Sequence, residues 1–534
     1  MIGLTSEMRE TGLRTGAGLL GMILAAMLTC LAVPAAPQDA GAAVPGDPVA
    51  VDSGMISGKL AGGDVKAYLG IPYAAPPVGM LRWRDPQPVT AWTGVRAANE
   101  YGAPCAQSGA AAAGAPAYTE DCLFLNVWAP VKAPEKKLPV IVYIYGGGYT
   151  GGSASAPSLS GEFLARKGAV FVNFNYRLSV LGSLATPELT AESRRKASGN
   201  FVHLDEIAVL QWVHRNIAAF GGDPGKVTLM GQSSGAIDVC YLQGSPLAKG
   251  LIHRVVALSG STFPGGPWGA RPLKDVERAG VQFREKLGAK SMAGLRAVPW
   301  EKLLENSWID IDEPALADGY VLPKPTPDVF AESGQSDVPA LLEWCRDEIF
   351  GGFSNVKTLE EYKEAVQRLA GPSAGQMLKL YPASNDEEAR QAALNAARSG
   401  AAAKQMIGWA AAQMGGMSPA YVSVFSYGQS AGHGKDVAYW LGTVGQTAAG
   451  PGGRSPQDAE LSGKLTDALL AFARTGDPNT PAIKWPKFEM KNPYRMDFGD
   501  KIAAVPVDKG VFFYLAYPNV KVGFGGGGRG GAGR

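Results

Sequence analysis

Histidine and cysteine are scarce in this chain, with four histidines and five cysteines among 534 residues. They do not form the short-spaced groups that a zinc site needs, so the sequence predicts no metal centre. An excess of charge is lacking too, because 50 Lys and Arg stand against 48 Asp and Glu. A nucleic-acid-binding protein, or one that binds an anionic membrane surface, would carry a basic patch. Neither partner is expected.

Hydrophobic residues are plentiful and bound the size of the fold. They make up 46% of the chain, enough for a large core, and one big domain explains the length as well as two ordinary domains would. We assign this domain to residues 49–518. Residues 523–534 are almost all glycine with two arginines, so residues 519–534 are expected to form a disordered tail.

The residues before this domain have the pattern of an export signal. An uncharged run rich in Leu, Ala and Met spans residues 17–32, arginines precede it, and the small residues Val33-Pro34-Ala35-Ala36 follow. The pattern predicts a signal peptide at residues 1–36 and a linker at 37–48. The mature protein is then secreted or periplasmic and has no stable membrane anchor. A retained anchor is the alternative.

The strongest functional signal is the segment Val227-Thr-Leu-Met-Gly-Gln-Ser-Ser-Gly-Ala236. It predicts an apolar strand, a sharp turn around Ser233 and then a helix. A serine between two glycines at such a junction is lifted clear of the sheet, where a base and a substrate can both reach it. The pattern therefore indicates a nucleophilic Ser233.

A second glycine cluster follows another predicted strand. The run Pro139–Tyr145 is β-branched and aromatic without charge, which is typical of a strand buried on both faces of a parallel sheet. Gly146, Gly147 and Gly148 come next, and glycines there let backbone N–H groups point into open space, as an oxyanion needs. An isolated triple glycine would indicate only a flexible loop, but the serine elbow on a later strand favours an oxyanion loop.

These two motifs belong to an ordered series that runs over roughly residues 50 to 515. Its other members are Gly70–Gly79, Glu120–Trp128, Asn175–Arg177, Phe220–Pro224, Leu258–Ser261, Asp347-Glu348, Gly432–Gly434 and Thr475–Asn479. In this series the chain resembles the type-B carboxylesterases, the family of the α/β-hydrolase fold that includes the cholinesterases. The resemblance implies an α/β fold with a mostly parallel central sheet flanked by helices on both faces.

A serine needs a base within hydrogen-bond reach to act as a nucleophile, and four histidines are candidates. His203 and His214 flank a predicted amphipathic helix at or near its surface, and His253 precedes a predicted strand. We expect these three in ordinary solvated positions. His433 stands between two glycines shortly after a predicted strand, at the end of the sheet where ligand sites gather. The resemblance selects the same residue.

The triad acid should fall between Ser233 and His433, because this fold uses the order Ser, acid, His. Asp347 and Glu348 follow a predicted strand in that interval. The resemblance implies Glu348, whose carboxylate would orient the imidazole and stabilise its protonated form. The family usually has glycine after this glutamate, where this chain has Ile349, so Asp347 remains an alternative.

The resemblance also implies the groups around the triad. The oxyanion hole would consist of the backbone N–H groups of Gly147, Gly148 and Ser234. Ser234 stands where the family usually has alanine, an exchange that keeps the N–H. Gln232 stands where the family has glutamate, so a neutral neighbour replaces a charged one and the pH optimum is expected to shift. Asp436, three residues after the histidine, matches a family acid and is expected to support the site.

The cysteines agree with export. Cys105 and Cys122 occupy positions where the family carries a disulfide, and closing a loop of about 17 residues stabilises a fold by roughly 3 kcal/mol in the chain-entropy model. Such a bond implies an oxidising compartment. Cys30 would leave with the signal peptide, and Cys240 and Cys345 are expected as small buried hydrophobes.

Two structural charge pairs of the family also recur, Arg82 with Glu120 and Arg177 with Asp205.

The leading hypothesis is an exported serine hydrolase that cleaves small carboxylic esters through an acyl-enzyme and needs no cofactor. Amidase or lactonase activity is the alternative, since the same triad serves all acyl transfer. A non-catalytic binding protein on this scaffold is a remote one, because such proteins usually lack a triad member. A cholinesterase is not expected, because residues 106–121 contain no tryptophan for choline.

Overall fold

The computed structural model describes residues 44–109, 111, 116–264, 270–308, 312, 316–349, 352–445 and 455–520. The predicted signal peptide, residues 1–36, lies outside the described residues, as do most of the predicted linker at 37–48 and of the predicted tail at 519–534. Among the helices that are described, none is both long and apolar enough to cross a membrane.

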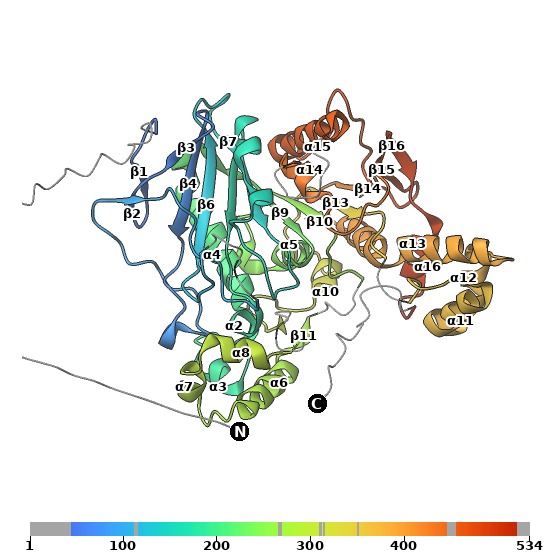
Figure 1. Ribbon diagram of the computed structural model, residues 1–534, viewed down its shortest axis with the longest axis horizontal. Helices are drawn as coiled ribbons and strands as arrows, with labels where there is room; N and C mark the ends of the chain where they lie inside the picture. Colours follow the sequence, from blue (N-terminus) through green and yellow to red (C-terminus); the bar gives the residue numbers. More distant parts are fainter. Residues whose placement is uncertain are drawn as a thin grey trace, which may run out of the picture. The chain divides into compact units, whose positions relative to one another are not determined.

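A large twisted sheet forms the centre of the described domain (Figure 1). In spatial order its eleven strands are β16 (Ile502–Pro506), β15 (Tyr494–Phe498), β14 (Ala420–Phe425), β13 (Ala340–Cys345), β10 (Arg254–Leu258), β9 (Gly222–Gln232), β7 (Leu138–Ile144), β8 (Val170–Phe174), β6 (Phe124–Pro130), β4 (Val65–Pro72) and β3 (Lys59–Ala61). All neighbours from β8 to β15 pair in parallel, and the outer pairs are antiparallel. The mostly parallel sheet expected from the sequence is therefore confirmed.

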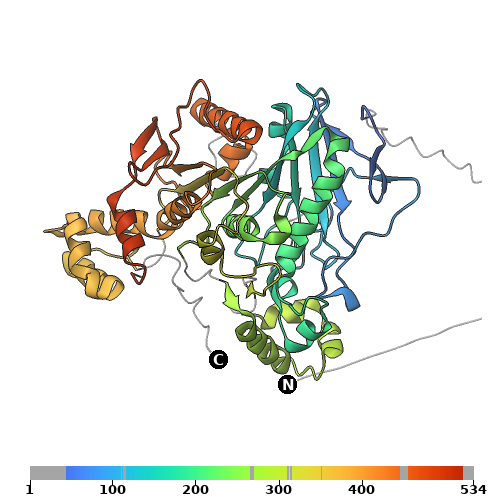
Figure 2. The same cartoon turned by 180° about the vertical axis from the view of Figure 1, so that it is seen from behind.

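The parallel strands are apolar because both of their faces are covered. Every residue of β7, β8 and β13 is buried, as is usual for strands between two layers of helices. Helices lie on both sides of the sheet (Figures 1 and 2). The helices of the described residues, including those that lie beyond the sheet, are α1 (Glu162–Arg166), α2 (Ser179–Ser183), α3 (Pro187–Glu192), α4 (Phe201–Asn216), α5 (Ser234–Gly244), α6 (Leu273–Lys286), α7 (Met292–Arg296), α8 (Trp300–Asn306), α10 (Thr326–Ala331), α11 (Leu359–Ala370), α12 (Ala374–Leu380), α13 (Asp386–Gln413), α14 (Val437–Leu441), α15 (Pro456–Thr475) and α16 (Lys509–Ala516).

Short elements complete the domain. A small sheet joins β1 (Val49–Val51), β2 (Gly54–Ser57) and β5 (Val95–Ala97), and β11 (Arg271–Pro272) pairs with β12 (Leu316–Ala317). The long helix α15 has clear local signals at both ends: a Ser455–Asp458 capping box at its start and Gly476 in a left-handed conformation at its end. Both arrangements satisfy backbone groups that a helix end leaves unpaired.

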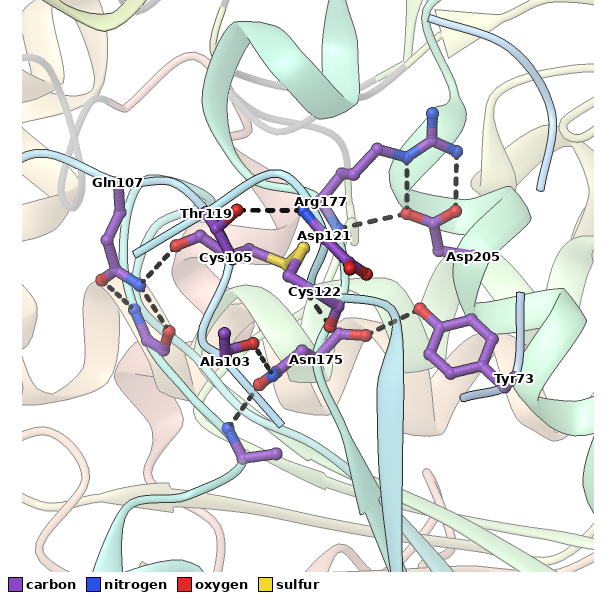
Figure 3. The surroundings of a disulfide bond; sticks show 12 residues. Tyr73, Ala103, Cys105, Gln107, Thr119, Asp121, Cys122, Asn175, Arg177 and Asp205 are labelled. Atoms are coloured by element: carbon purple, nitrogen blue, oxygen red, sulfur yellow. Dashed lines mark hydrogen bonds and ion pairs between the residues drawn. A yellow bond between two sulfur atoms is a disulfide. The ribbon is translucent and has the colours of Figure 1, made fainter. Parts of the chain in front are cut away.

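A disulfide joins Cys105 to Cys122, with a Cα–Cα distance of 4.9 Å. Figure 3 shows its surroundings, where Gln107 in the disulfide loop bonds through its amide to both the N–H and the C=O of Gly152.

The two structural ion pairs expected from the sequence are present. Arg82 Nε donates to Glu120 at 2.6 Å, and the pair Arg177–Asp205 is buried with a closest contact of 2.6 Å.

Candidate active site

The nucleophile elbow has the geometry that its glycines predict. Strand β9 ends at Gln232 and helix α5 begins at Ser234, so Ser233 alone makes the turn, with φ 56° and ψ −125°. A non-glycine residue in this region of backbone space is strained and is found where the surrounding fold holds it. A Cβ on Gly231 would lie 2.2 Å from the Gly235 carbonyl oxygen, and one on Gly235 would lie 2.3 Å from that of Ile144. No side chain fits at either position.

Three groups that are far apart in sequence meet at the carboxyl edge of the sheet. Ser233 follows β9, Glu348 follows β13 and His433 follows β14. His433 Nε2 lies 2.9 Å from Ser233 Oγ, and its Nδ1 lies 3.2 Å from Glu348 Oε2. Burial lowers the pKa of His433, but the Glu348 carboxylate and then Asp436 raise it more, so the pKa stands above the ordinary value.

Glu348 is fixed from its other side. Its Oε1 accepts hydrogen bonds from the Ser259 hydroxyl and, at 2.9 Å, from the backbone N–H of Cys345. The carboxylate is 3% exposed. Ser259 had no role in the sequence interpretation beyond its place in a family motif. Ser259 directly follows β10, which lies between the strands that lead to Ser233 and Glu348. This position is the signal from which a role for Ser259 in the site could have been predicted.

Asp347, the alternative acid, points elsewhere. Its carboxylate pairs with Arg346 at 2.7 Å and with Arg398 at 2.6 Å, and it accepts the N–H of Ala431 at 2.9 Å. Burial alone would raise the pKa of Asp347, but these hydrogen bonds hold it well below its usual value. Asp347 therefore links β13 to α13 and to the loop before His433, and Glu348 is the carboxylate beside the imidazole.

The predicted oxyanion donors lie next to the elbow. Gly147 and Gly148 follow β7, with φ 137° and 60°, and Ser234 is the first residue of α5. The Gly148 N–H donates to Ser234 Oγ at 3.1 Å, so the serine that replaces the family alanine contributes a hydroxyl to this corner as well as its N–H. A small pocket opens here, lined by Gly148, Ser233, Ser234, Ile237, Ser259, Gly260 and Gln405.

Comparison with known proteins shows which family the chain resembles over most of its length. Residues 46–509 match the model of the carboxylesterase family. A fumonisin B1 esterase of Sphingopyxis macrogoltabida is 34% identical over 90% of each chain, and a para-nitrobenzyl esterase of Bacillus subtilis is 31% identical over 82% of this chain and 92% of its own. A solved PNB esterase superposes with a TM-score of 0.73 at 27% identity, covering 89% of this chain and 99% of its own.

The chain belongs to the carboxylesterase family. The α/β-hydrolase fold and the assignment as an ester-hydrolysing enzyme are thereby confirmed. Within this carboxylesterase, two residues singled out from the sequence flank the histidine. Gln232 places its amide nitrogen 3.2 Å from His433 Nε2, the nitrogen that faces Ser233. Asp436 is fully buried, and burial together with the nearby Glu348 charge raises the pKa of Asp436 to about 6.

None of the other histidines of the carboxylesterase is hydrogen-bonded to Ser233 in the described chain, and one expectation about them is wrong. His214 is exposed and His253 is half-buried, close to the solvated positions expected. His203 is not solvated: it is fully buried, with Nε2 3.1 Å from Asp238 on α5. Helix α4 starts at Phe201, so His203 lies inside its first turn and faces the elbow helix α5.

Proposed function

We propose that this carboxylesterase is an exported serine hydrolase that cleaves carboxylic esters through an acyl-enzyme, with Ser233, His433 and Glu348 as its triad. The observation that supports the proposal is the continuous contact from Ser233 Oγ to His433 Nε2 at 2.9 Å and from His433 Nδ1 to Glu348 at 3.2 Å. A base between a hydroxyl and a buried carboxylate is the arrangement that activates serine.

The first half-reaction forms the acyl-enzyme. Ser233 Oγ attacks the ester carbonyl carbon while its proton moves to His433 Nε2, and Glu348 stabilises the resulting imidazolium. The N–H groups of Gly147 and Ser234 stabilise the negative oxygen of the tetrahedral intermediate, joined by the Gly148 N–H when it exchanges its bond to Ser234 Oγ for the oxyanion. Removing one such donor typically slows catalysis about 10²- to 10³-fold. The intermediate then collapses, the carbon–oxygen bond to the alcohol breaks, and His433 gives its proton to the departing oxygen.

The second half-reaction restores the enzyme. A water molecule loses a proton to His433 and attacks the acyl carbon, and the same N–H groups hold the new oxyanion. The bond between the acyl carbon and Ser233 Oγ breaks, the serine regains its proton from His433, and the carboxylic acid leaves. Every proton is carried by the imidazole, so the scheme needs no cofactor.

The substrate class follows from the family and its named members. The relatives hydrolyse fumonisin B1 or para-nitrobenzyl esters by their names, so we propose small organic carboxylic esters. Export is proposed on the residue 1–36 pattern and on the Cys105–Cys122 disulfide. Residues 49–518 are proposed as the folded hydrolase domain.

Pre-steady-state kinetics with p-nitrophenyl esters of graded acyl length would test the reaction type. We expect a burst of about one p-nitrophenol per enzyme followed by a slower steady state, as an accumulating acyl-enzyme requires. Matched p-nitroanilides and lactones measured in parallel should turn over much more slowly. Faster turnover of either would reassign the enzyme as an amidase or a lactonase, and no turnover of any of the three would contradict a hydrolase.

A further inference from the structure

A second cluster of ionisable groups lies directly behind the nucleophile and has no role in the proposed reaction. His203 and Glu206 on α4 face Asp238 on α5, and all three are 0–1% exposed. One nitrogen or oxygen from each lies within 4.8 Å of the others. Asp238 is one and a half turns along the helix that Ser233 begins, so this cluster adjoins the elbow.

Asp238 is the centre of the cluster and reaches the oxyanion loop. Its Oδ1 accepts the hydroxyl of Tyr149 at 2.9 Å and lies 3.1 Å from His203 Nε2. Tyr149 follows Gly148 directly and, although not a glycine, has φ 60°. That conformation costs about 1–2 kcal/mol for a residue with a side chain, so an anchor is needed to hold it. The Tyr149 hydroxyl bond to Asp238 is such an anchor.

The two carboxylates of the cluster lack hydrogen-bond donors and a cation. Within the described chain, Asp238 Oδ2 and both oxygens of Glu206 have no hydrogen-bond partner. No lysine or arginine in that part of the chain pairs with either carboxylate, since the nearby Arg177 is paired with Asp205. Two ionised carboxylates buried together without a cation would cost several kcal/mol each in desolvation. One added positive charge, a proton or a metal ion, would remove most of this cost.

A proton fits the contacts better than a metal ion does. His203 Nε2 lies 3.1 Å from Asp238 Oδ1, a distance that suits a hydrogen bond from an imidazole N–H to the carboxylate. The same oxygen already accepts from Tyr149. Burial first, and then the charge of Asp238, raise the pKa of Glu206 well above its ordinary value.

We propose that Glu206 and Asp238 share one proton and that this pair, acting through Tyr149, positions the oxyanion loop behind Ser233. These are positioning residues, since none touches the reacting atoms. The titratable and charged groups around the pair are His203, Tyr73, Tyr145, Tyr149, Tyr176 and the Arg177–Asp205 pair. The inference rests on the proposed oxyanion role of Gly147 and Gly148.

The shared proton has a consequence at alkaline pH. Because the pKa of Glu206 is raised in the folded state, stability should fall as pH rises from the ordinary pKa of a glutamate toward the folded one, where only the folded state still holds the proton. Above the folded pKa, two negative charges are left buried together, and the order of the oxyanion loop should fall. Glutamine is the neutral isostere of a protonated glutamate and keeps a donor toward Asp238. The variant Glu206→Gln should therefore match the wild-type kcat at neutral pH and keep that kcat to higher pH.

The experiment compares pH profiles of kcat and of thermal unfolding for the wild type, Glu206→Gln and the control Glu364→Gln, which changes an exposed glutamate on α11. We expect the alkaline decline of kcat, and the fall of stability as pH rises above the ordinary pKa of a glutamate, to weaken only in Glu206→Gln. Tyr149→Phe, which loses the hydroxyl, should lower kcat by about tenfold with little change in KM, because an oxyanion contact acts mainly in the transition state.

Three results would overturn the inference. They are an alkaline profile of Glu206→Gln that matches the wild type, a Glu206→Gln protein that fails to fold, and one equivalent of a transition metal in the purified enzyme by elemental analysis. Stoichiometric labelling with a fluorophosphonate separates this failure from that of the proposed function. If wild type labels at Ser233 and Glu206→Gln behaves like wild type, only the shared-proton account fails.

Discussion

Asp347 and Glu348 are adjacent carboxylates whose surroundings give them different work. Two guanidinium groups and a backbone N–H hold Asp347 as an anion that ties α13 and the loop before the histidine to the sheet. Glu348 turns into the interior, where Ser259 and Cys345 fix one oxygen and leave the other toward His433. One carboxylate is therefore suited to hold the fold, and its neighbour to orient a base.

The variants Glu348→Gln and Asp347→Asn should separate these roles. Glu348→Gln should lower kcat by roughly 10³- to 10⁴-fold, as losing the anionic partner of a triad histidine does, with little change in the melting temperature. Asp347→Asn should keep kcat within about tenfold and lower stability by about 1–3 kcal/mol. That stability contribution is present at neutral pH and is lost on acidification, because the folded pKa of Asp347 is depressed. A larger kcat loss in Asp347→Asn would reassign the acid.

Gln232 sets the charge next to the imidazole. Its amide lies 3.2 Å from His433 Nε2, and the variant Gln232→Glu would place a carboxylate there and favour protonated His433. Because the base must be neutral to accept the serine proton, the acid limb of the kcat/KM profile should move to higher pH. Gln391→Glu, an exposed change on α13, should not move it. An unchanged or downward-shifted acid limb in Gln232→Glu would contradict this account.

At the level of elements, the strand–turn–helix unit around Ser233 depends on close backbone approaches. Helix α5 packs against β9 and β10, and its second residue, Gly235, touches the end of β7 where a Cβ would meet the Ile144 carbonyl at 2.3 Å. The same approach brings the start of α5 beside the glycines that follow β7. The glycine spacing visible in the sequence thus sets the distance between Ser233 and the proposed oxyanion donors.

Replacing two helical glycines with alanine should have opposite effects. Gly235→Ala has no room, so it should destabilise the fold by about 1–3 kcal/mol and reduce kcat by displacing the loop after β7. Gly463→Ala in α15 has nothing within 4 Å of the new Cβ and should stabilise by about 0.5–1 kcal/mol. Thermal unfolding and kcat of the two variants provide the comparison. Equal stability of both would show that the elbow is less tightly packed than its geometry indicates.

Over the whole domain, the parts of the site marked by local patterns were predictable from the sequence. Ser233 and the loop after β7 carry glycine signatures, and His433 stood out because few histidines compete with it. Contacts between distant segments were not predictable in the same way. The burial of His203 depends on the packing of α4 beneath α5, and the Ser259–Glu348 bond joins residues 89 positions apart; neither leaves a periodic pattern along the chain.

The disulfide connects stability of the whole domain to the site. Its loop bonds through Gln107 to Gly152, which follows the predicted oxyanion glycines (Figure 3). Changing Cys105 and Cys122 together to serine should lower the free energy of unfolding by roughly 3 kcal/mol for this loop length.

Cys240 and Cys345 are buried, and burial raises the pKa of the Cys240 thiol to about 11. Mass analysis after alkylation of the native protein should therefore find one disulfide and no modified thiol. Modification of Cys105 or Cys122 without reductant would contradict the oxidised pair.

The central claim is that Ser233 is the nucleophile, and covalent trapping tests it most directly. The wild-type enzyme is treated with a fluorophosphonate, and the modified residue is located by peptide mass spectrometry beside the folded variant Ser233→Ala. We expect about one label per enzyme on Ser233, parallel loss of ester turnover, and neither label nor turnover in the variant. Labelling at Ser234 or Ser259, or ester turnover that survives in Ser233→Ala, would contradict the account.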